Sequence, residues 1–358
     1  MQKDFKAEST KKEKRPVIGI RADGNEILGM GHLMRCMSIG RELEKQGAQC
    51  VFFAAGEQAG SFLRERGFFC EVLHTDYQHM EEEIPLLNHA AEKYAPKLWL
   101  VDSYQITQKY LRELGKICPV FYLDDTGQQI YEAEGLINYN ICGEDLGYEA
   151  LCSQSMKLLL GAKYAPVKEE FVTTPYCIRQ DVENVLITMG GSDKLNITGM
   201  VCQSLLEKLP EYMKFTLICG RFNPHLAELV QLKEGNERVF VKVDVPDMWN
   251  KLAAADVVVT AAGSTMYELS AMGIPSVCCY YVENQRRIAE GFAHRVGLCN
   301  GGDYSAEPEA VLERLAEAVQ ELVYNKEKRM HLAECMKQVS DGHGARRIAN
   351  ELLQQTEP

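Results

Sequence analysis

Short runs of β-branched and other apolar residues alternate with helix-length amphipathic segments along nearly the whole chain. The strand-like runs lie at 17–20, 50–54, 98–101 and 120–123 in the first half, and at 185–189, 215–219, 239–243, 257–260 and 276–280 in the second. Between the first two runs, residues 33–46 place apolar side chains at helical spacing and stop at Gly47. Further helical patterns cover 197–209, 265–272 and much of 308–355. This alternation predicts parallel sheets with helices on both faces.

The alternation is interrupted near the middle of the chain, which indicates two domains. Residues 158–184 contain two prolines and the charged stretch 168–170, as an interdomain connection often does. The expected parts are a polar tail (1–16), a first Rossmann-like domain (17–165), a linker (166–184), a second Rossmann-like domain (185–330) and C-terminal helices (331–358). Two such doubly wound domains would face each other across a cleft, with ligands at the carboxyl ends of the strands.

Composition and charge narrow the possible functions. The 358 residues carry a net charge of -12, which argues against a nucleic-acid partner or a membrane-surface role. The run at 17–20 is too short for a signal sequence or a spanning helix, and the 13 cysteines form no CxxC pair. We therefore expect a cytoplasmic protein without a metal site or cofactor. A phosphate pocket is still compatible with this charge, because backbone N–H groups bind anions locally.

The first candidate loop follows the first strand. It contains Arg21 and Asp23, and then Gly29-Met30-Gly31-His32 at the start of a helix. Glycines allow a ligand to approach the backbone, and a helix N-terminus attracts negative charge. His32 is placed to act as a general base or to bind phosphate, and an equally simple interpretation is a histidine that caps the helix.

The second half offers three further loops. Gly190-Gly191-Ser192-Asp193 resembles an anion-binding turn, although Ser192 or Asp193 could also be an ordinary helix cap. Ser264 and Thr265 begin a helix whose N–H groups can receive phosphate, and Glu268, one turn later, can accept hydrogen bonds from a ribose diol. A cap with a helix-dipole partner is the alternative for this turn. Asn284 and Gln285 follow another strand and could orient a sugar or phosphate, or cap the next helix.

Polar residues after other strands are less specific. Asp102 and Tyr104 follow one strand of the first half, and Asp124 and Asp125 follow the next. Each acid could act in the cleft, yet acids in such positions are also common caps of helices and turns. Tyr164, near the linker, could line the cleft or simply be packed.

Taken in order, these loops resemble the PseG family of UDP-sugar hydrolases. The resemblance spans about 17–293 and is carried by the following residues: Arg21-Ala22-Asp23, Gly29-Met30-Gly31-His32, Met34-Arg35-Cys36, Leu123-Asp124-Asp125, Gly161-Ala162-Lys163-Tyr164-Ala165, Gly190-Gly191-Ser192-Asp193, Ala262-Gly263-Ser264-Thr265-Met266-Tyr267-Glu268 and Glu283-Asn284-Gln285. That family is similar to the MurG-type glycosyltransferases. The resemblance therefore implies a GT-B type fold made of two doubly wound Rossmann-like domains that face an interdomain cleft.

The resemblance also implies an activity. It is the metal-independent and cofactor-independent hydrolysis of UDP-2,4-diacetamido-2,4,6-trideoxy-β-L-altropyranose in pseudaminic acid (nonulosonate) biosynthesis, which releases UDP and the free sugar. Position by position, His32 matches the catalytic histidine. Ser264, Thr265 and Glu268 match the nucleotide-binding turn, and Asn284 matches an amide of the cleft. The expected substrate-binding set is Arg21, Asp23, Gly31, Tyr104, Gly190, Gly191, Ser192, Ser264, Thr265, Glu268, Asn284 and Gln285.

These assignments imply a mechanism, and three alternative functions are also compatible with the sequence. His32 would orient or deprotonate a water that attacks the anomeric carbon, with Asp23 as the nearest alternative base. The helix that begins near Ser264 would stabilise the departing diphosphate. A glycosyltransferase with a UDP-sugar donor, a sugar-nucleotide 2-epimerase and a non-catalytic nucleotide-sugar binding protein are the alternatives. The epimerase would need several acids around the sugar, and a binding protein could dispense with His32.

Overall fold

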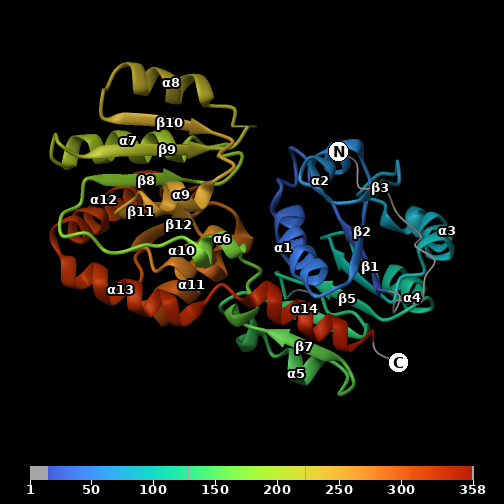
Figure 1. Ribbon diagram of the computed structural model, residues 1–358. Coiled ribbons are helices and arrows are strands. Elements are labelled where there is room, and N and C mark those ends of the chain that lie inside the picture. The colour runs from blue at the N-terminus through green and yellow to red at the C-terminus, as the bar shows by residue number, and fades with distance from the viewer. Residues whose placement is uncertain (1–14, 128, 222, 357–358) are drawn as a thin grey trace. The chain divides into compact units, whose positions relative to one another are not determined.

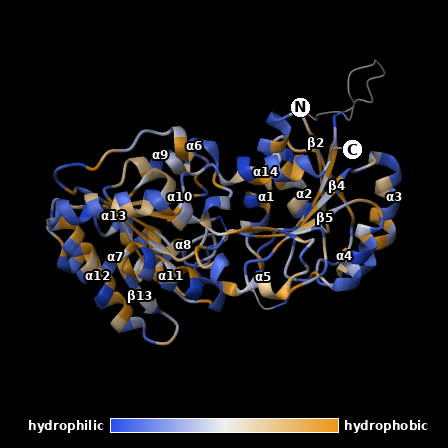
Figure 2. Ribbon diagram, turned by 90° about the horizontal axis from the view of Figure 1, so that it is seen from below, coloured by the Kyte–Doolittle hydropathy of each residue, from blue (hydrophilic) through white to orange (hydrophobic). Residues whose placement is uncertain are grey.

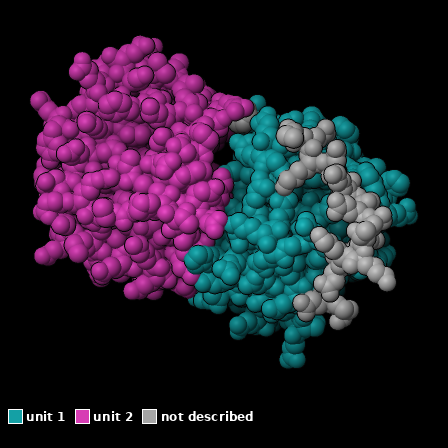
Figure 3. Space-filling view, viewed as in Figure 1, with its two compact units in different colours: residues 1–166, 343–358 teal, residues 167–342 magenta. Residues whose placement is uncertain are grey.

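The computed structural model describes residues 15–127, 129–221 and 223–356 and divides the chain into two compact units. The expected tail 1–16 lies almost entirely outside the described residues. The first unit comprises residues 1–166 and 343–358, and the second comprises residues 167–342 (Figure 3). Each unit is an α/β layer built on one parallel sheet, so the expected fold class is confirmed.

The first unit contains a seven-stranded parallel sheet in the order β3-β2-β1-β4-β5-β6-β7 (Figure 1). Its strands are β1 (Val17–Ala22), β2 (Gln49–Ala54), β3 (Cys70–Val72), β4 (Leu98–Asp102), β5 (Val120–Leu123), β6 (Gly135–Asn138) and β7 (Lys157–Leu160). The chain order reverses between β1 and β4, which are hydrogen-bonded neighbours. Residues that follow these two strands therefore meet at the switch point of the sheet, where open α/β sheets bind ligands.

Helices cover the sheet of the first unit. They are α1 (Gly31–Lys45), α2 (Glu57–Glu65), α3 (Ile84–Tyr94), α4 (Gln108–Gly115), α5 (Tyr148–Leu151) and α14 (Gly344–Gln354), with 3-10 turns η1 (Met80–Glu83), η2 (Gly143–Leu146) and η3 (Ala162–Tyr164). The strands are largely apolar, whereas the helices show polar outer faces (Figure 2). At the centre, a Cβ on Gly19 of β1 would lie 2.4 Å from the ring of the fully buried Trp99. Glycine at this position lets the large indole pack directly on the neighbouring strand.

The last helix returns to the first unit. Helix α14 packs on α1 and η3, and its Arg347 donates a hydrogen bond to the Lys163 carbonyl. A Cβ on Gly344 would lie 2.2 Å from the Ala165 carbonyl oxygen, so the start of α14 approaches that backbone very closely. The sequence predicts residues 331–358 as one set of C-terminal helices. The structure divides that set after Gly342, because α13 belongs to the second unit and α14 to the first.

The second unit contains a six-stranded parallel sheet in the order β10-β9-β8-β11-β12-β13. Its strands are β8 (Asn184–Thr188), β9 (Lys214–Cys219), β10 (Val239–Val243), β11 (Val257–Ala261), β12 (Ser276–Tyr280) and β13 (Asn300–Asp303). Its helices are α6 (Glu169–Thr173), α7 (Ile197–Lys208), α8 (Leu226–Glu234), α9 (Met248–Ala253), α10 (Thr265–Met272), α11 (Glu283–Val296), α12 (Pro308–Tyr324) and α13 (Lys326–Val339). The strand order reverses between β8 and β11, as it does between β1 and β4.

The segment expected to be a linker is partly built into the second unit. Helix α6 packs against α10, and Phe171 of α6 meets Trp249 edge to face. Arg329 is buried and donates to the Arg179 and Gln180 carbonyls as well as to two carbonyls at the end of α12. One guanidinium therefore ties the start of the second unit to its closing helices, since each donated bond satisfies a backbone carbonyl.

Candidate functional site

Five polar side chains meet at the carboxyl edge of the first sheet around His32. His32 is the second residue of α1, and its Nδ1 lies 2.7 Å from Oδ1 of Asp102, the last residue of β4. Arg35, one helical turn after His32, donates from Nε to Asp102 Oδ2 and from Nη2 to Asp102 Oδ1, both at 2.6 Å. Its Nη1 donates to Asp125 at 2.8 Å. Tyr104 closes the group, because its ring meets the His32 ring edge to face and its hydroxyl donates to Asp125.

The pairing with Asp102 determines how His32 can act. The imidazole is 6% exposed and the carboxylate 1%. Burial alone would raise the pKa of Asp102, but the charge of Arg35 and the hydrogen bonds from Arg35 and His32 reverse this and hold it well below its usual value. An ionised carboxylate at this distance accepts the Nδ1–H of the imidazole, which leaves the lone pair on Nε2. This is the tautomer that a general base requires.

Arg21 and Asp23 were expected to bind substrate, but both are buried and hydrogen-bonded within the protein. Arg21 is completely buried and donates to Glu83, which lies 62 positions later in the chain, and to Asp23. Burial alone would lower the pKa of Arg21, but the carboxylates of Asp23 and Glu83 raise it. Asp23 also accepts the Ala55 amide, so both of its oxygens are engaged. We correct the expectation for Arg21, which has no exposed surface with which to contact a substrate; Asp23 holds the loop through hydrogen bonds to both of its carboxylate oxygens.

The two acids that follow β5 also have different roles. Asp125 joins the His32 group through Arg35 and Tyr104. Asp124 instead accepts the amides of Thr126 and Gly127 and the hydroxyl of Tyr148. It is therefore a turn-forming residue, which is the ordinary role of an acid after a strand.

In the second unit, the loops after β8, β11 and β12 come from three adjacent strands. Strand β11 pairs with β8 on one side and with β12 on the other, so their carboxyl ends lie together. The Tyr281 hydroxyl, after β12, donates to the Met189 carbonyl after β8 at 3.0 Å, which joins two of these loops. The sheet thus gathers Gly190, Gly191 and Ser192, Ser264 and Thr265, and Asn284 and Gln285 at one edge.

The helix start after β11 offers free donors. Ser264 precedes the first residue of α10, and its side chain makes no capping hydrogen bond. The first bonds of this turn run from the Met266 and Tyr267 amides to Gly263 and Ser264. The Ser264 and Thr265 amides have no acceptor among the described residues, and a Cβ on Gly263 would meet open space. Such an end of a helix can receive a phosphate group.

Glu268 lies in the first turn of the same helix and is partly buried. Burial raises the pKa of this carboxyl to about 7, although the charge of Lys168 opposes the shift. Within the described part of the chain, no donor is bonded to its carboxylate. A half-buried acid with an unused hydrogen-bonding capacity is suited to accept hydroxyl donors from a ligand.

The turn after β8 is already partly filled by the protein. Asp193 has a positive φ of 36°, is 1% exposed and accepts the Ile197 and Thr198 amides at the start of α7. Its carboxylate therefore takes the place that an anion would have at this helix end. Similarly, Gln285 accepts the Tyr281 amide within the first turn of α11, while Asn284 is exposed on that turn. Asp193 therefore caps α7, the alternative that the sequence left open, whereas Gln285 bonds to a residue that precedes α11.

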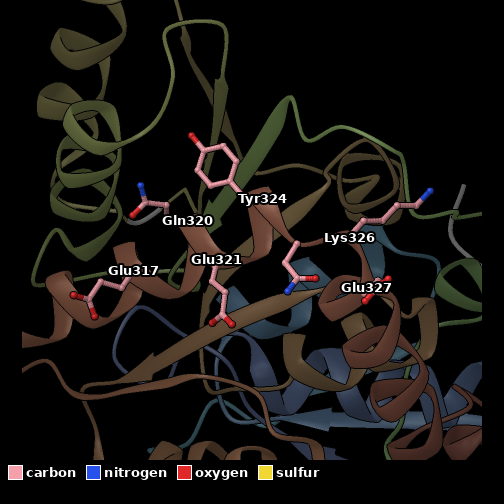
Figure 4. Close-up of a pocket in the computed structure, with 7 residues that line it drawn as sticks. Glu317, Gln320, Glu321, Tyr324, Lys326 and Glu327 are labelled. Atoms are coloured by element: carbon pink, nitrogen blue, oxygen red, sulfur yellow. The ribbon is translucent and has the colours of Figure 1, made fainter.

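The hollow in Figure 4 is not part of either group. It lies where α12 ends and α13 begins, and it is lined by the following residues: Glu317, Gln320, Glu321, Tyr324, Asn325, Lys326 and Glu327. These side chains come from α12, from α13 and from the residue between them, not from the ends of strands. In the described ranges, no group of three or more His, Cys, Asp or Glu side chains is arranged to hold a metal ion.

This chain is similar to known proteins in part of its sequence and in its fold. Residues 184–352 match the glycosyltransferase family 28 C-terminal domain. The chain has a MurG-like GT-B fold. MurG of Acinetobacter baumannii superposes with a TM-score of 0.66 at 11% identity, over 95% of this chain and 99% of that chain. A UDP-GlcNAc 2-epimerase from Neisseria meningitidis, bound to UDP-GlcNAc, gives a TM-score of 0.63 at 14% identity over 95% of this chain and all of that chain.

Relatives in sequence are distant. The UDP-2,4-diacetamido-2,4,6-trideoxy-beta-L-altropyranose hydrolase of Campylobacter jejuni is 22% identical over 77% of this chain and 95% of its own length. The spore coat polysaccharide biosynthesis protein SpsG of Bacillus subtilis is 24% identical over 77% of this chain and 80% of its own. An uncharacterized protein of Methanocaldococcus jannaschii is 22% identical over 78% of this chain, and the match spans only 58% of that protein. No helix in the described part of this GT-B protein is both long and apolar enough to cross a membrane.

The buried Arg21–Glu83 pair gives a first testable prediction. Replacing Glu83 by Gln removes the charge that faces a guanidinium without access to water, so we expect a loss of about 3 kcal/mol in the free energy of unfolding. Urea unfolding followed by Trp99 fluorescence in a Trp249→Phe background reports on the first unit, because these are the two tryptophans of the chain. The control is Glu82→Gln, one position earlier on an exposed site, with an expected change below about 0.5 kcal/mol. Equal stability of the two variants would contradict the structural role of the pair.

Proposed function

We propose that this GT-B protein hydrolyses a UDP-linked diacetamido-trideoxy sugar to UDP and the free sugar, as a step in nonulosonate biosynthesis such as that of pseudaminic acid. The observation that carries the proposal is the buried His32–Asp102 pair, which engages Nδ1 of the ring and leaves Nε2 for the role of base at the ligand-binding edge of a parallel sheet. Support also comes from the hydrolase of Campylobacter jejuni, which matches this chain along 95% of its own length.

The first unit supplies the base in this proposal. Nε2 of His32 accepts a proton from a water molecule as the water oxygen bonds to the anomeric carbon. The bond between that carbon and the oxygen of the β-phosphate breaks, and UDP leaves with the electron pair. Asp102 holds the ring in position and stabilises the imidazolium that forms, because its own charge is retained throughout. His32 then returns the proton to solvent.

The second unit supplies the nucleotide site. The Ser264 and Thr265 amides donate to the diphosphate and offset the charge that grows on it as the bond breaks. Glu268 accepts hydrogen bonds from the ribose hydroxyls, and Asn284 contacts the sugar or phosphate. The same edge of the second sheet also contains Gly190, Gly191 and Ser192. The sugar is proposed to bind in the first unit, next to His32, Gly31 and Tyr104. UDP-sugar is thus the proposed ligand, and the backbone, rather than net positive charge, is the source of anion affinity.

A glycosyltransferase with the same donor is the second candidate, and the family 28 match favours it. It would use the same nucleotide site but transfer the sugar to an acceptor instead of water. The two are separated by incubating the protein with the UDP-sugar alone, because only a hydrolase turns it over without an acceptor. A protein that binds UDP but turns over no UDP-sugar, with or without acceptors, would be a binding protein.

The role of His32 predicts a selective loss of turnover. In His32→Ala, we expect the rate of UDP release, followed by phosphorus NMR, to fall by about two to four orders of magnitude, since general-base catalysis contributes at this level. The affinity for UDP, measured by calorimetry, should change by less than about threefold, because the nucleotide contacts belong to the other unit. His89→Ala, at an exposed position in α3, is the control and should keep full activity. Near wild-type turnover of His32→Ala would remove the base from this mechanism.

The elevated pKa of Glu268 predicts a pH-dependent nucleotide affinity. Ribose hydroxyls donate to the ionised carboxylate, so binding requires loss of the proton that this carboxyl holds below its pKa of about 7. Affinity for UDP should therefore rise with pH, and the ratio of wild-type to Glu268→Gln affinity should increase about tenfold between pH 6 and pH 8. Calorimetry on both proteins cancels the ionisation of UDP itself. A ratio that stays flat across this range would mean that Glu268 does not hold the ribose.

A further inference from the structure

The His32 group contains more charge than a histidine–aspartate pair needs. Arg35 contacts both oxygens of Asp102, and its Nη2 lies 3.0 Å from His32 Nδ1. Through Nη1 it also donates to Asp125 and to the hydroxyl of Tyr139, each at 2.8 Å. Arg35 is 8% exposed, so these charges interact with little screening by water. Burial alone would lower the pKa of Arg35, but Asp102, Tyr139 and Asp125 raise it well above its usual value, so it stays charged.

Asp125 contributes a negative charge, and only one of its two carboxylate oxygens accepts hydrogen bonds from the described residues. Its Oδ2 accepts from Arg35 and from the Tyr104 hydroxyl. Its Oδ1 is buried and has no donor among the described residues. The negative charge of Asp125 therefore acts on its neighbours with little screening by water, although Arg35 compensates part of it.

The formal charge of the group depends on the protonation state of His32. With a neutral His32, the two carboxylates outweigh the single guanidinium by one negative charge. When His32 takes a proton, the group becomes neutral. Other titratable neighbours among the described residues are Tyr104, Tyr139 and the Cys36 thiol near Asp102. Burial, with Asp102 adding to the effect, raises the pKa of that thiol far above neutrality. The group is therefore balanced between Arg35, which opposes protonation of His32, and Asp125, which promotes it.

We propose that Arg35 and Asp125 are positioning residues that set the base strength of His32 in opposite directions, acting through the carboxylate of Asp102 and through the field of the buried group. The proposal rests on the proposed role of His32 as the base. Without Arg35, the imidazole would be held as imidazolium by two carboxylates and would be a poor base at neutral pH. Without Asp125, the group would carry a net positive charge once the imidazolium forms in the reaction, and the base would be weaker.

The test is the pH dependence of two charge-removing variants of the full chain. The acid limb of kcat/KM for the UDP-sugar marks the protonation of the free base. In Arg35→Gln it should move to higher pH by about one unit, and in Asp125→Asn to lower pH by about half a unit, as expected for removal of a charge a few ångströms away. A purely structural role would lower the rate of both variants but would not move the two limbs apart.

Charge-conserving and neutral variants provide the controls. Arg35→Lys keeps the charge and Tyr139→Phe removes only a hydroxyl, so both should keep the acid limb within about 0.3 units of the wild type. Should Arg35→Gln fail to fold, Arg35→Lys and Asp125→Asn decide the outcome. An Asp125→Asn limb that stays in place or moves to higher pH overturns the proposal, as does a common direction for both charge-removing variants.

A second readout separates this proposal from the proposed function. Proton NMR titration of the His32 ring, identified among the eight histidines by the signal that His32→Gln lacks, needs no turnover. Opposite shifts of the titration midpoint in a protein that hydrolyses no UDP-sugar would support the charge balance and reject the hydrolase. Hydrolysis with unmoved midpoints would support the hydrolase and reject the charge balance.

Discussion

The carboxylate of Asp102 is the group on which the candidate site depends. It is almost fully buried and stays ionised only because Arg35 and His32 face it. In return, it fixes the tautomer of His32 and the orientation of the Arg35 guanidinium, which then reaches Asp125 and Tyr139. A buried charge without partners would cost several kcal/mol, so the contacts of Arg35 and His32 with Asp102 stabilise the first unit.

The strand order explains why such a network forms at this point. The reversal between β1 and β4 places the end of β4 directly beside the start of α1, so that Asp102 and His32 meet although they are 70 positions apart. Beneath them, Arg21 and Glu83 hold the loop that leads to the helix. The second unit repeats the reversal between β8 and β11 and provides the helix start at Ser264. An acidic chain can thus hold a diphosphate, since backbone amides provide the donors.

Much of this architecture could be predicted from the pattern of apolar residues. The central strands and the helices at 31–45, 197–208 and 265–272 were recognisable, because buried parallel strands are strongly apolar and the helices are amphipathic. Strands β3, β6, β7 and β13 were not recognised. They have three or four residues, and β13 reads Asn-Gly-Gly-Asp, so pairing with a neighbour rather than composition defines them. The return of α14 to the first unit was missed for a similar reason, since tertiary packing alone distinguishes it from α13.

The candidate site was predictable only where a local motif carried it. The glycine-rich loop pointed to His32, and the turn at 263–268 pointed to Ser264, Thr265 and Glu268. Asp102 was one of several acids after strands, and its partnership with His32 depends on the crossover order of the sheet. Arg21 was misjudged because its partner Glu83 lies in a distant segment. Asp193 acts as a cap, and a single sequence does not distinguish a cap from a ligand-binding residue.

The most direct test of the central claim, attack of water on the anomeric carbon by means of the His32 base, is an isotope experiment. The purified protein is incubated with the UDP-diacetamido-trideoxy sugar in water enriched in oxygen-18, without an acceptor, and both products are analysed by rapid quenching and mass spectrometry. The mechanism predicts the heavy oxygen in the free sugar and none in UDP. Label in the UDP phosphate would mean that water attacks phosphorus, and no release of UDP would mean that water is not the acceptor; either result would contradict the account.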